Sequence, residues 1–451
     1  MDLFPQLLHN LDRGPCGRTD DADNEAAMTR QLFANEHEVT SGQDISSMAF
    51  WRKPFIERDE TFAWLREHAP VSWQPPIEDA DLPSEVHGEA GFWAVTRAED
   101  ISYVSQHNQL FTTSQGSVSL RPRHPDTVTT PNFLEMDPPQ HTRYRQIMSA
   151  AFTPKAVARL NAQIQQRAHD IVSAVAGAGE FDFVKEVSAK LPMLTIADMV
   201  GVPENLVQTF ADAGDNFVGG RDEAMLPPGM TQIEFVIEQL NILRDIGVDL
   251  VHYRREHPSD DIATALGEAR MDGQPLSDDE IASTMLLLSV AGNDTTKQTT
   301  SWTTLSLDRN PDQRAWLVED FDARIGGAIE EFVRHATPVM CFGRLATQDV
   351  ELGGRQIKAG DKVGIMYCSG NRDERVFDDP HRFDLQRPRS PHVGFGGGGI
   401  HYCLGNGIAK AQLRALFREI LTLLPDLEVG APEMLYSEFI NGIRRLPVRT
   451  N

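Results

Sequence analysis

One uninterrupted helical pattern, from Ser277 to Leu307, most constrains how this chain of 451 residues can fold. Ser277 and Glu280 have the spacing of a capping box, in which each side chain bonds to the backbone N–H of the other residue at the start of a helix. Asn310-Pro311 ends the pattern, because proline interrupts a helix. About 30 residues of helix span about 45 Å, which is the width of a whole domain. The sequence therefore predicts one helix that crosses the molecule.

Shorter periodic segments accompany this central helix. A second helix is expected over residues 324–335, before the next proline, and a third begins just after Cys403. Residues 344–368 have strand patterning instead, and Gly353-Gly354 divides them as a hairpin. Because helices dominate and no regular alternation of strands and helices is visible, the sequence predicts a mainly α fold with small β-sheets, of the α+β class.

Charge and composition exclude some classes of function. Asp and Glu outnumber Lys and Arg by 66 to 42, and the formal net charge of −24 argues against binding to nucleic acid or anionic membranes. The four cysteines have no C-x-x-C spacing, which is typical of a reducing compartment. The first residues lack a signal-peptide pattern, and no apolar run is long enough to span a bilayer. We therefore expect a cytoplasmic protein with no membrane anchor, in which residues 1–43 are a loosely ordered N-terminal extension.

A glycine-rich stretch near the C-terminus, GFGGGGIHYCLGNG, raises the question of its ligand. Gly394, Gly396 and Gly399 have the GxGxxG spacing of a dinucleotide-binding loop. Such a loop must follow a buried strand, however, and the preceding RPRSPHV is too rich in proline and arginine to be one. The spacing alone is therefore weak evidence for a nucleotide.

The same stretch also presents a sulfur. Cys403 precedes the last predicted helix, where free backbone N–H groups and the helix dipole lower the pKa of a thiol. Gly399, Gly405 and Gly407 leave room for a flat, bulky group to approach the backbone. The local pattern leaves two alternatives open, a reactive thiolate and an inert buried cysteine in a structural turn.

Three further motifs carry chemically useful groups. The sequence AGNDTT, at 291–296, puts an acid beside a hydroxyl inside the long helix, where Thr295 can bend the helix by bonding back to a carbonyl. Glu331 and Arg334 are neighbours on one helix face, and His141 and Arg145 lie one helical turn apart, as in an anion-binding site. Each motif also has a plainer explanation, as a polar turn, a solvated ion pair or a surface helix.

Together these motifs resemble those of the cytochrome P450 family, and the resemblance extends from about residue 44 to residue 450. The matching residues are His141 and Arg145 of H-x-x-x-R; Ala291, Gly292, Asp294 and Thr295 of A-G-x-[DE]-T; Glu331 and Arg334 of E-x-x-R, with Arg387 as third partner; and Phe395, Gly399, His401, Cys403 and Gly405 of the haem-binding loop.

The resemblance implies the P450 fold, a triangular prism of helices, as a single domain over residues 44–451. It implies that Cys403 is the axial ligand to the iron of haem b (iron protoporphyrin IX). The roles that it implies for the other residues are as follows: His141, Arg145, Arg344 and His401 hold the haem propionates; Ala291 and Gly292 line the oxygen side, where Gly292 leaves room for O2; Asp294 and Thr295 are catalytic; Phe395 and Gly405 belong to the haem loop; Glu331, Arg334 and Arg387 form a structural network.

The activity implied is that of a monooxygenase, which inserts one oxygen atom from O2 into a C–H bond of an apolar small molecule. Electrons would come from NAD(P)H through a reductase and a ferredoxin or flavodoxin, docked at Arg143, Lys410 and Arg414. The alternatives are a peroxide-driven haem enzyme and a haem-based binding or sensing protein.

The haem loop departs from the common bacterial pattern by one extra residue between Phe395 and Cys403. In this respect it resembles bacterial P450s that act on sterols and methyl-branched lipids, which suggests a sterol, isoprenoid or branched-lipid substrate. Arg121, Arg123 and His124 are candidates for binding a carboxylate end of such a substrate.

Overall fold

The computed structural model describes residues 43–78, 91–115, 118–121, 130–220, 222–388 and 391–450. The predicted N-terminal extension, except for its last residue, lies outside these ranges, as do Arg123 and His124. The division into one domain over residues 44–451 therefore stays a prediction. Within the described ranges, no helix combines the length and the apolar character that crossing a membrane requires.

Helices make up most of the structure. The α-helices are α2 (Met48–Trp51), α3 (Phe55–His68), α4 (Ala98–Gln106), α5 (Gln140–Ser149), α6 (Pro154–Ser173), α7 (Lys190–Val200), α8 (Val207–Gly219), α9 (Gln232–Glu256), α10 (Ile262–Glu268), α11 (Asp278–Arg309), α12 (Pro311–Glu319), α13 (Phe321–Ala336), α14 (Tyr367–Gly370) and α15 (Asn406–Leu423). Short helical turns are η3 (Phe133–Glu135), η4 (Ala150–Phe152), η5 (Val184–Ser188), η6 (Glu204–Leu206) and η7 (Glu223–Met225). The strands are β1 (Val71–Gln74), β2 (Phe92–Val95), β3 (Phe111–Thr112), β4 (Gly179–Asp182), β5 (Arg270–Met271), β6 (Gln274–Pro275), β7 (Cys341–Ala346), β8 (Val350–Leu352), β9 (Arg355–Ile357), β10 (Lys362–Met366), β11 (Glu428–Val429), β12 (Glu433–Leu435), β13 (Gly442–Arg445) and β14 (Pro447–Thr450).

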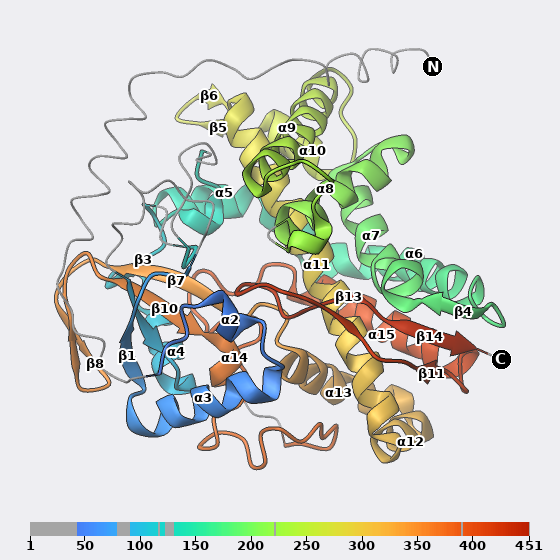
Figure 1. The fold of residues 1–451 in the computed structure, drawn as a ribbon. Helices are drawn as coiled ribbons and strands as arrows, with labels where there is room; N and C mark the ends of the chain where they lie inside the picture. Colours follow the sequence, from blue (N-terminus) through green and yellow to red (C-terminus); the bar gives the residue numbers. More distant parts are fainter. Residues whose placement is uncertain are drawn as a thin grey trace.

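Helix α11 runs through the middle of the molecule (Figure 1). Its start has the predicted capping box: Ser277 Oγ accepts the Glu280 N–H at 3.3 Å, and Glu280 Oε2 accepts the Ser277 N–H at 2.7 Å. The helix ends at Arg309, just before Pro311. The prediction of one long helix that crosses the molecule is confirmed.

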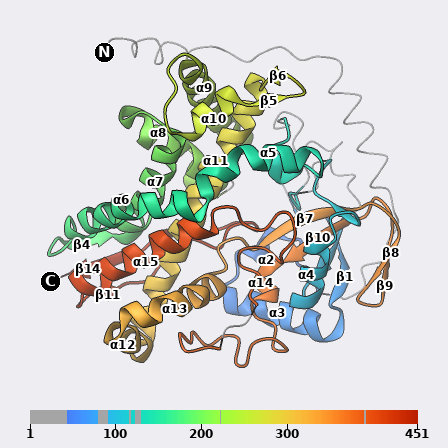
Figure 2. The same cartoon turned by 180° about the vertical axis from the view of Figure 1, so that it is seen from behind.

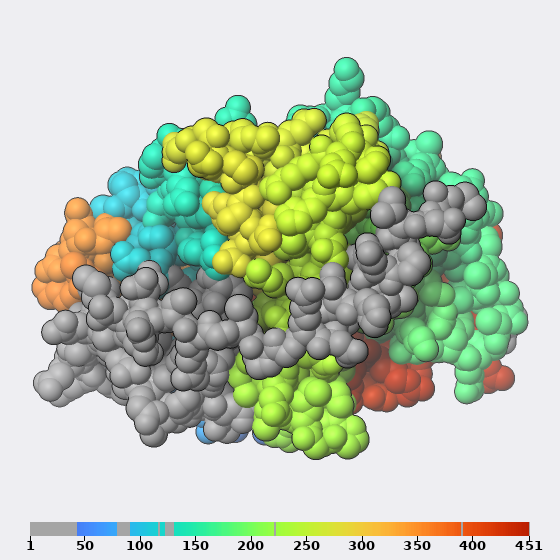
Figure 3. Space-filling view, turned by 90° about the horizontal axis from the view of Figure 1, so that it is seen from above, coloured from blue at the N-terminus to red at the C-terminus, as the bar shows by residue number. Residues whose placement is uncertain are grey.

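Apolar cores lie on both sides of α11. One core joins it to α6, α13 and α15 through residues such as Leu305, Phe332 and Phe417, and α6 and α15 lie side by side (Figure 2). The other core joins it to α7, α8, α9 and α10 through residues such as Leu243 and Met285. In the view from above, the chain from α8 to the start of α11 forms much of the surface (Figure 3). Because α8 and α9 pack on α11, the middle of α11 is largely covered.

The largest sheet stands beside the helical part (Figure 1) and has the strand order β1-β2-β10-β7-β3. Its central strand β10 pairs in parallel with β2 and antiparallel with β7, where Val363 faces Arg344. The predicted hairpin is confirmed, since Gly353 and Gly354 connect β8 to β9 with positive φ angles of 55° and 73°. The remaining sheets have two or three strands, so the predicted mainly α fold with small sheets is confirmed.

Candidate active site

Cys403 lies in the loop that leads into α15. Its N–H donates to the Phe395 carbonyl at 3.0 Å, and Asn406 Nδ2 donates to the Cys403 carbonyl at 2.8 Å. Burial raises the pKa of the Cys403 thiol, and the backbone N–H groups of Gly405 and Asn406 lower it by less. The sequence predicted a lowered pKa because of the start of the helix. That prediction is wrong, since burial has the larger effect and the net shift is upward.

The glycine run of this loop packs against α4. A Cβ atom at Gly399 would lie 2.2 Å from the Ser105 carbonyl oxygen, and one at Gly397 would lie 2.6 Å from Ser105 Oγ. Gly396, Gly398 and Gly399 also have positive φ angles of 97°, 97° and 73°, which other residues rarely adopt. The expectation that Gly399 leaves room for a flat ligand is thus wrong, since α4 fills that space. No strand directly precedes the run in the described part of the chain, so the dinucleotide interpretation gains no support.

His141 of α5 and His401 of the loop lie together, with 4.4 Å between their ring centroids. Among the described residues, neither nitrogen of His141 has a hydrogen-bond partner, nor does Nδ1 of His401, although all three atoms are buried. The remaining nitrogen of His401 lies 3.1 Å from Thr113 Oγ1. Buried nitrogen atoms without partners are rare in proteins. These groups are therefore available to a ligand that exchanges hydrogen bonds with them.

Two arginines add positive charge at the same place. Arg145 Nη2 donates to the Tyr402 carbonyl at 2.6 Å, and Arg344 Nη1 donates to the Gly343 carbonyl at 2.6 Å. Burial, followed by the charges of Arg344, His141 and Arg145, lowers the pKa of His401 to about 2. The two arginines and the unpartnered nitrogens of His141 and His401 fit a ligand that carries carboxylates. The two propionates of a haem are such carboxylates.

The motif inside α11 has the expected side-chain hydrogen bond and one unexpected contact. Thr295 Oγ1 donates to the Ala291 carbonyl at 3.0 Å, as predicted. A Cβ atom at Gly292, however, would lie only 2.7 Å from Ile196 Cγ1 of α7. The missing side chain of Gly292 therefore leaves room for Ile196 of α7, and its role on the oxygen side stays a prediction.

Asp294 belongs to a buried ion network between α11 and α8. Lys297 Nζ lies 2.6 Å from Asp294 Oδ1 and 2.7 Å from Asp215 Oδ2, and Asn293 Nδ2 donates to Asp215 Oδ1 at 2.7 Å. Burial alone would lower the pKa of Lys297, but the charges of the two carboxylates outweigh it and raise this pKa. Lys297 thus stays charged, and Asp294 Oδ2 has no partner within the described ranges.

Lys297 and Asp215 were not predicted from the sequence. The contact of Lys297 with Asp294 could have been predicted, because residues three positions apart on one helix are neighbours on its surface. Asp215 lies on another helix, and nothing in its local sequence indicates the contact.

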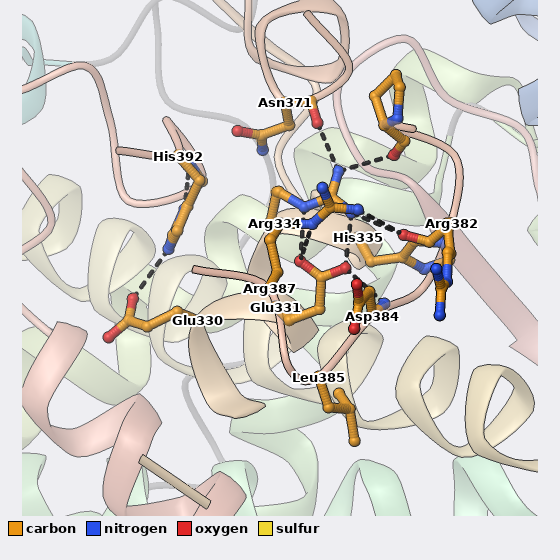
Figure 4. A network of polar contacts seen from close by, with 12 residues as sticks. Glu330, Glu331, Arg334, His335, Asn371, Arg382, Asp384, Leu385, Arg387 and His392 are labelled. Carbon is orange, nitrogen blue, oxygen red and sulfur yellow. Dashed lines mark hydrogen bonds and ion pairs between the residues drawn. The ribbon is translucent and has the colours of Figure 1, made fainter. Parts of the chain in front are cut away.

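Glu331 and Arg334 form a buried ion pair, and Figure 4 shows the two side chains facing each other. Arg334 Nε and Nη2 are each 2.7 Å from a Glu331 oxygen, and Arg334 Nη1 donates to the Asn371 and Pro380 carbonyls at 2.8 Å. Arg387 Nε lies 3.4 Å from Glu331 Oε2 but does not have hydrogen-bonding geometry. The network therefore ties α13 to the segment that precedes the Cys403 loop.

Other expected ligand-binding cations have partners in the chain itself. Arg121 forms an ion pair with Glu438 at 2.6 Å, so the expectation that it binds a substrate carboxylate is not supported. The three expected docking residues also pair with carboxylates: Arg143 with Asp272, Lys410 with Glu330 and Arg414 with Asp322, each at 2.7 to 2.8 Å.

Comparisons with known proteins agree with this arrangement. Residues 235–424 match the family model described as Cytochrome P450. A methyl-branched lipid omega-hydroxylase of Mycobacterium tuberculosis is 40% identical, over 94% of this chain and 99% of its own length. A steroid C26-monooxygenase of Mycolicibacterium smegmatis is 38% identical, over 86% of this chain and 90% of its own length.

Solved structures give the same result. A Mycobacterium marinum cytochrome P450, solved in complex with pseudoionone, has a TM-score of 0.89 and 44% sequence identity, and the match covers 93% of this chain and 100% of that one. Relatives this similar, over nearly the whole length, show the activity class as well as the fold. The chain belongs to the cytochrome P450 family and is a monooxygenase.

Proposed function

We propose that this P450 hydroxylates an unactivated C–H bond of a methyl-branched lipid or a steroid, at a haem whose iron is bound by Cys403. When bound, the haem supplies the oxidising chemistry: O2, two electrons and two protons yield one oxygen atom for the substrate and one water molecule. The observation that carries the proposal is the cluster of buried, unpartnered histidine nitrogens beside the Cys403 loop.

His141, Arg145, Arg344 and His401 would hold the two haem propionates. If a carboxylate lies beside the neutral ring of His141, the protonated nitrogen of that ring gains an acceptor. Hydrogen bonds to charged groups are stronger than neutral ones, and they would offset the burial of the Arg145 and Arg344 guanidinium groups. The same contacts would orient the haem relative to Cys403.

Asp294 would move protons on the oxygen side of the haem, the role that the resemblance implies for it. Its Oδ1 is held by Lys297 at 2.6 Å, whereas its Oδ2 is unpartnered in the described structure. A carboxylate held in this way can exchange a proton at one oxygen without losing its position. Thr295 Oγ1 bonds to the Ala291 carbonyl, and its oxygen can still accept a hydrogen bond.

The substrate class is proposed from the relatives and from the loop. The relatives named above act, by their names, on methyl-branched lipids and steroids. The extra residue between Phe395 and Cys403 is in keeping with that group. The segments expected to line the substrate site are 111–133, 210–235, 339–342 and 439–440.

Electrons would reach the site from NAD(P)H through a reductase and a ferredoxin or flavodoxin in the cytoplasm. The exposed ring of Tyr402, next to Cys403, marks the face nearest the sulfur. Arg143 and Arg414 are about half exposed despite their ion pairs, so an acidic partner can compete for them.

Spectroscopy of the purified, haem-containing protein tests the proposal. The reduced protein with CO should give a thiolate-type spectrum, and a branched fatty acid or a steroid with an aliphatic side chain should shift the Soret band. Product analysis should then find a hydroxyl group on that ligand. Absence of the thiolate-type spectrum would overturn the role of Cys403. Turnover of a linear fatty acid alone, with no shift from the two expected classes, would overturn the substrate assignment.

A further inference from the structure

The last helix carries a cation that is held against the Cys403 loop. Lys410 of α15 has its Nζ 5.0 Å from the centre of the Phe395 ring and 2.7 Å from Glu330 Oε1. A cation over an aromatic face is attracted by the electrons of the ring. Phe395 in turn accepts the Cys403 N–H at 3.0 Å through its carbonyl. Phe395 thus links the two residues: its ring contacts Lys410, and its carbonyl accepts a hydrogen bond from Cys403.

Glu330 fixes this lysine and also the start of the loop. Its Oε2 lies 2.9 Å from His392 Nε2, a contact that Figure 4 shows. The Gly394 N–H donates to His392 Nδ1 at 3.1 Å, so the hydrogen of a neutral ring is on Nε2 and is donated to Glu330. This hydrogen bond, and after it the contact with Lys410, lowers the pKa of Glu330 to about 2 despite burial. Glu330 is therefore ionised at neutral pH and can hold Lys410 by charge.

The geometry points to Lys410 as a positioning residue that sets how readily the haem bound at Cys403 accepts an electron. This inference rests on the proposed role of Cys403. The iron and its ligands gain one negative charge on reduction, and a nearby fixed cation stabilises that charge. Lys410 is well suited to this task because Glu330 and Phe395 hold it in place and because it is half-buried, where water screens its charge less than at the surface.

The test is the midpoint potential of the purified holoenzyme, measured at an electrode without a partner protein. Lys410→Met should lower the equilibrium constant for reduction by on the order of tenfold, which is about 59 mV for one electron. Lys410→Arg should retain most of the wild-type potential. Glu330→Gln should raise the potential, because it removes a negative charge. Arg418→Gln is the matched control, since it removes the same charge from the same helix two turns farther on, and its shift should be much smaller.

Two results would overturn the inference. One is an equal shift in Lys410→Met and Arg418→Gln, which would show only a general effect of net charge. The other is a shift in the same direction in Lys410→Met and Glu330→Gln, which would show that distortion of the loop matters and charge does not. If Lys410→Met fails to take up haem, the sign of the Glu330→Gln shift decides alone.

The reduced CO spectrum of each protein separates this inference from the proposed function. A thiolate-type spectrum with an unchanged potential in Lys410→Met overturns the role of Lys410 and leaves that of Cys403 intact. A wild-type protein without this spectrum overturns the role of Cys403 itself.

Discussion

Replacing Lys297 with methionine should destabilise the protein strongly, because two carboxylates at the contact of α8 and α11 lose their cation. Lys297 Nζ lies 2.7 Å from Asp215 Oδ2 and 2.6 Å from Asp294 Oδ1. The side chains of Lys297 and Asp294 are 9% and 2% exposed, whereas that of Asp215 is 26% exposed. Removing one partner of a buried ion pair costs about 3–5 kcal/mol. Since Asp215 can regain some hydration, we expect the lower value, about 3 kcal/mol, in the free energy of unfolding.

The pH dependence of this loss identifies its cause. Burial raises the pKa of Asp215 and Lys297 opposes the rise, so the variant should have a still higher pKa at this residue. A carboxyl group with a raised pKa binds more protons in the folded state than in the unfolded state. Its cost to stability therefore grows as the pH rises from the pKa of the unfolded state to that of the folded state, and it shrinks as the pH falls. The deficit of Lys297→Met should be largest near neutral pH and should decrease toward pH values of about 4.

Urea unfolding at several pH values, followed by circular dichroism, measures this deficit. Lys190→Met is the matched control, because Lys190 pairs with Glu186 at 2.6 Å while the side chains are 37% and 34% exposed. Exposed pairs one helical turn apart contribute only about 0.3–0.5 kcal/mol. If Lys297→Met loses no more than this control, or if its deficit does not change with pH, the explanation by unpaired buried carboxylates is refuted.

Three further substitutions test other parts of the structure. Glu331→Gln should cost about 3–5 kcal/mol in unfolding free energy, because it leaves Arg334 buried without its anion; a loss below about 1 kcal/mol, the range of surface pairs, would contradict this. Gly292→Ala should cost about 1–3 kcal/mol by overpacking against Ile196, and combining it with Ile196→Ala should give less than the sum of the single effects, whereas strict additivity would show that the two sites do not touch. The folded-state pKa of Glu330 is about 2, below its ordinary 4.5, so its stabilisation is complete above pH 4.5 and is lost as the pH falls toward 2. The difference in stability between wild type and Glu330→Gln should shrink over that interval, and a constant difference would argue against the ionised pair.

Much of the fold was predictable because it depends on local interactions. The capping box at Ser277 and Glu280 involves residues three positions apart, and the hairpin at Gly353-Gly354 needs only the conformational freedom of its turn. The motifs and their order along the chain resemble those of the P450 family, and this resemblance also indicated the family. These features can be read from a short window of sequence.

Other features depend on contacts between distant segments. The glycine run before Cys403 faces α4, and Gly292 faces α7, so the purpose of these glycines is visible only once the helices are packed. The pKa of Cys403 was predicted in the wrong direction because the sequence shows the start of a helix but not the extent of burial. Similarly, Asp215 meets Lys297 only because α8 crosses α11.

The role of Cys403 is tested most directly by one measurement, the reduced CO difference spectrum of the wild type beside that of Cys403→Ala. The wild type should give a thiolate-type spectrum, and the variant should lose it while its far-ultraviolet circular dichroism stays that of a mainly helical protein. A thiolate-type spectrum that survives in Cys403→Ala would contradict the assignment of this sulfur as the iron ligand.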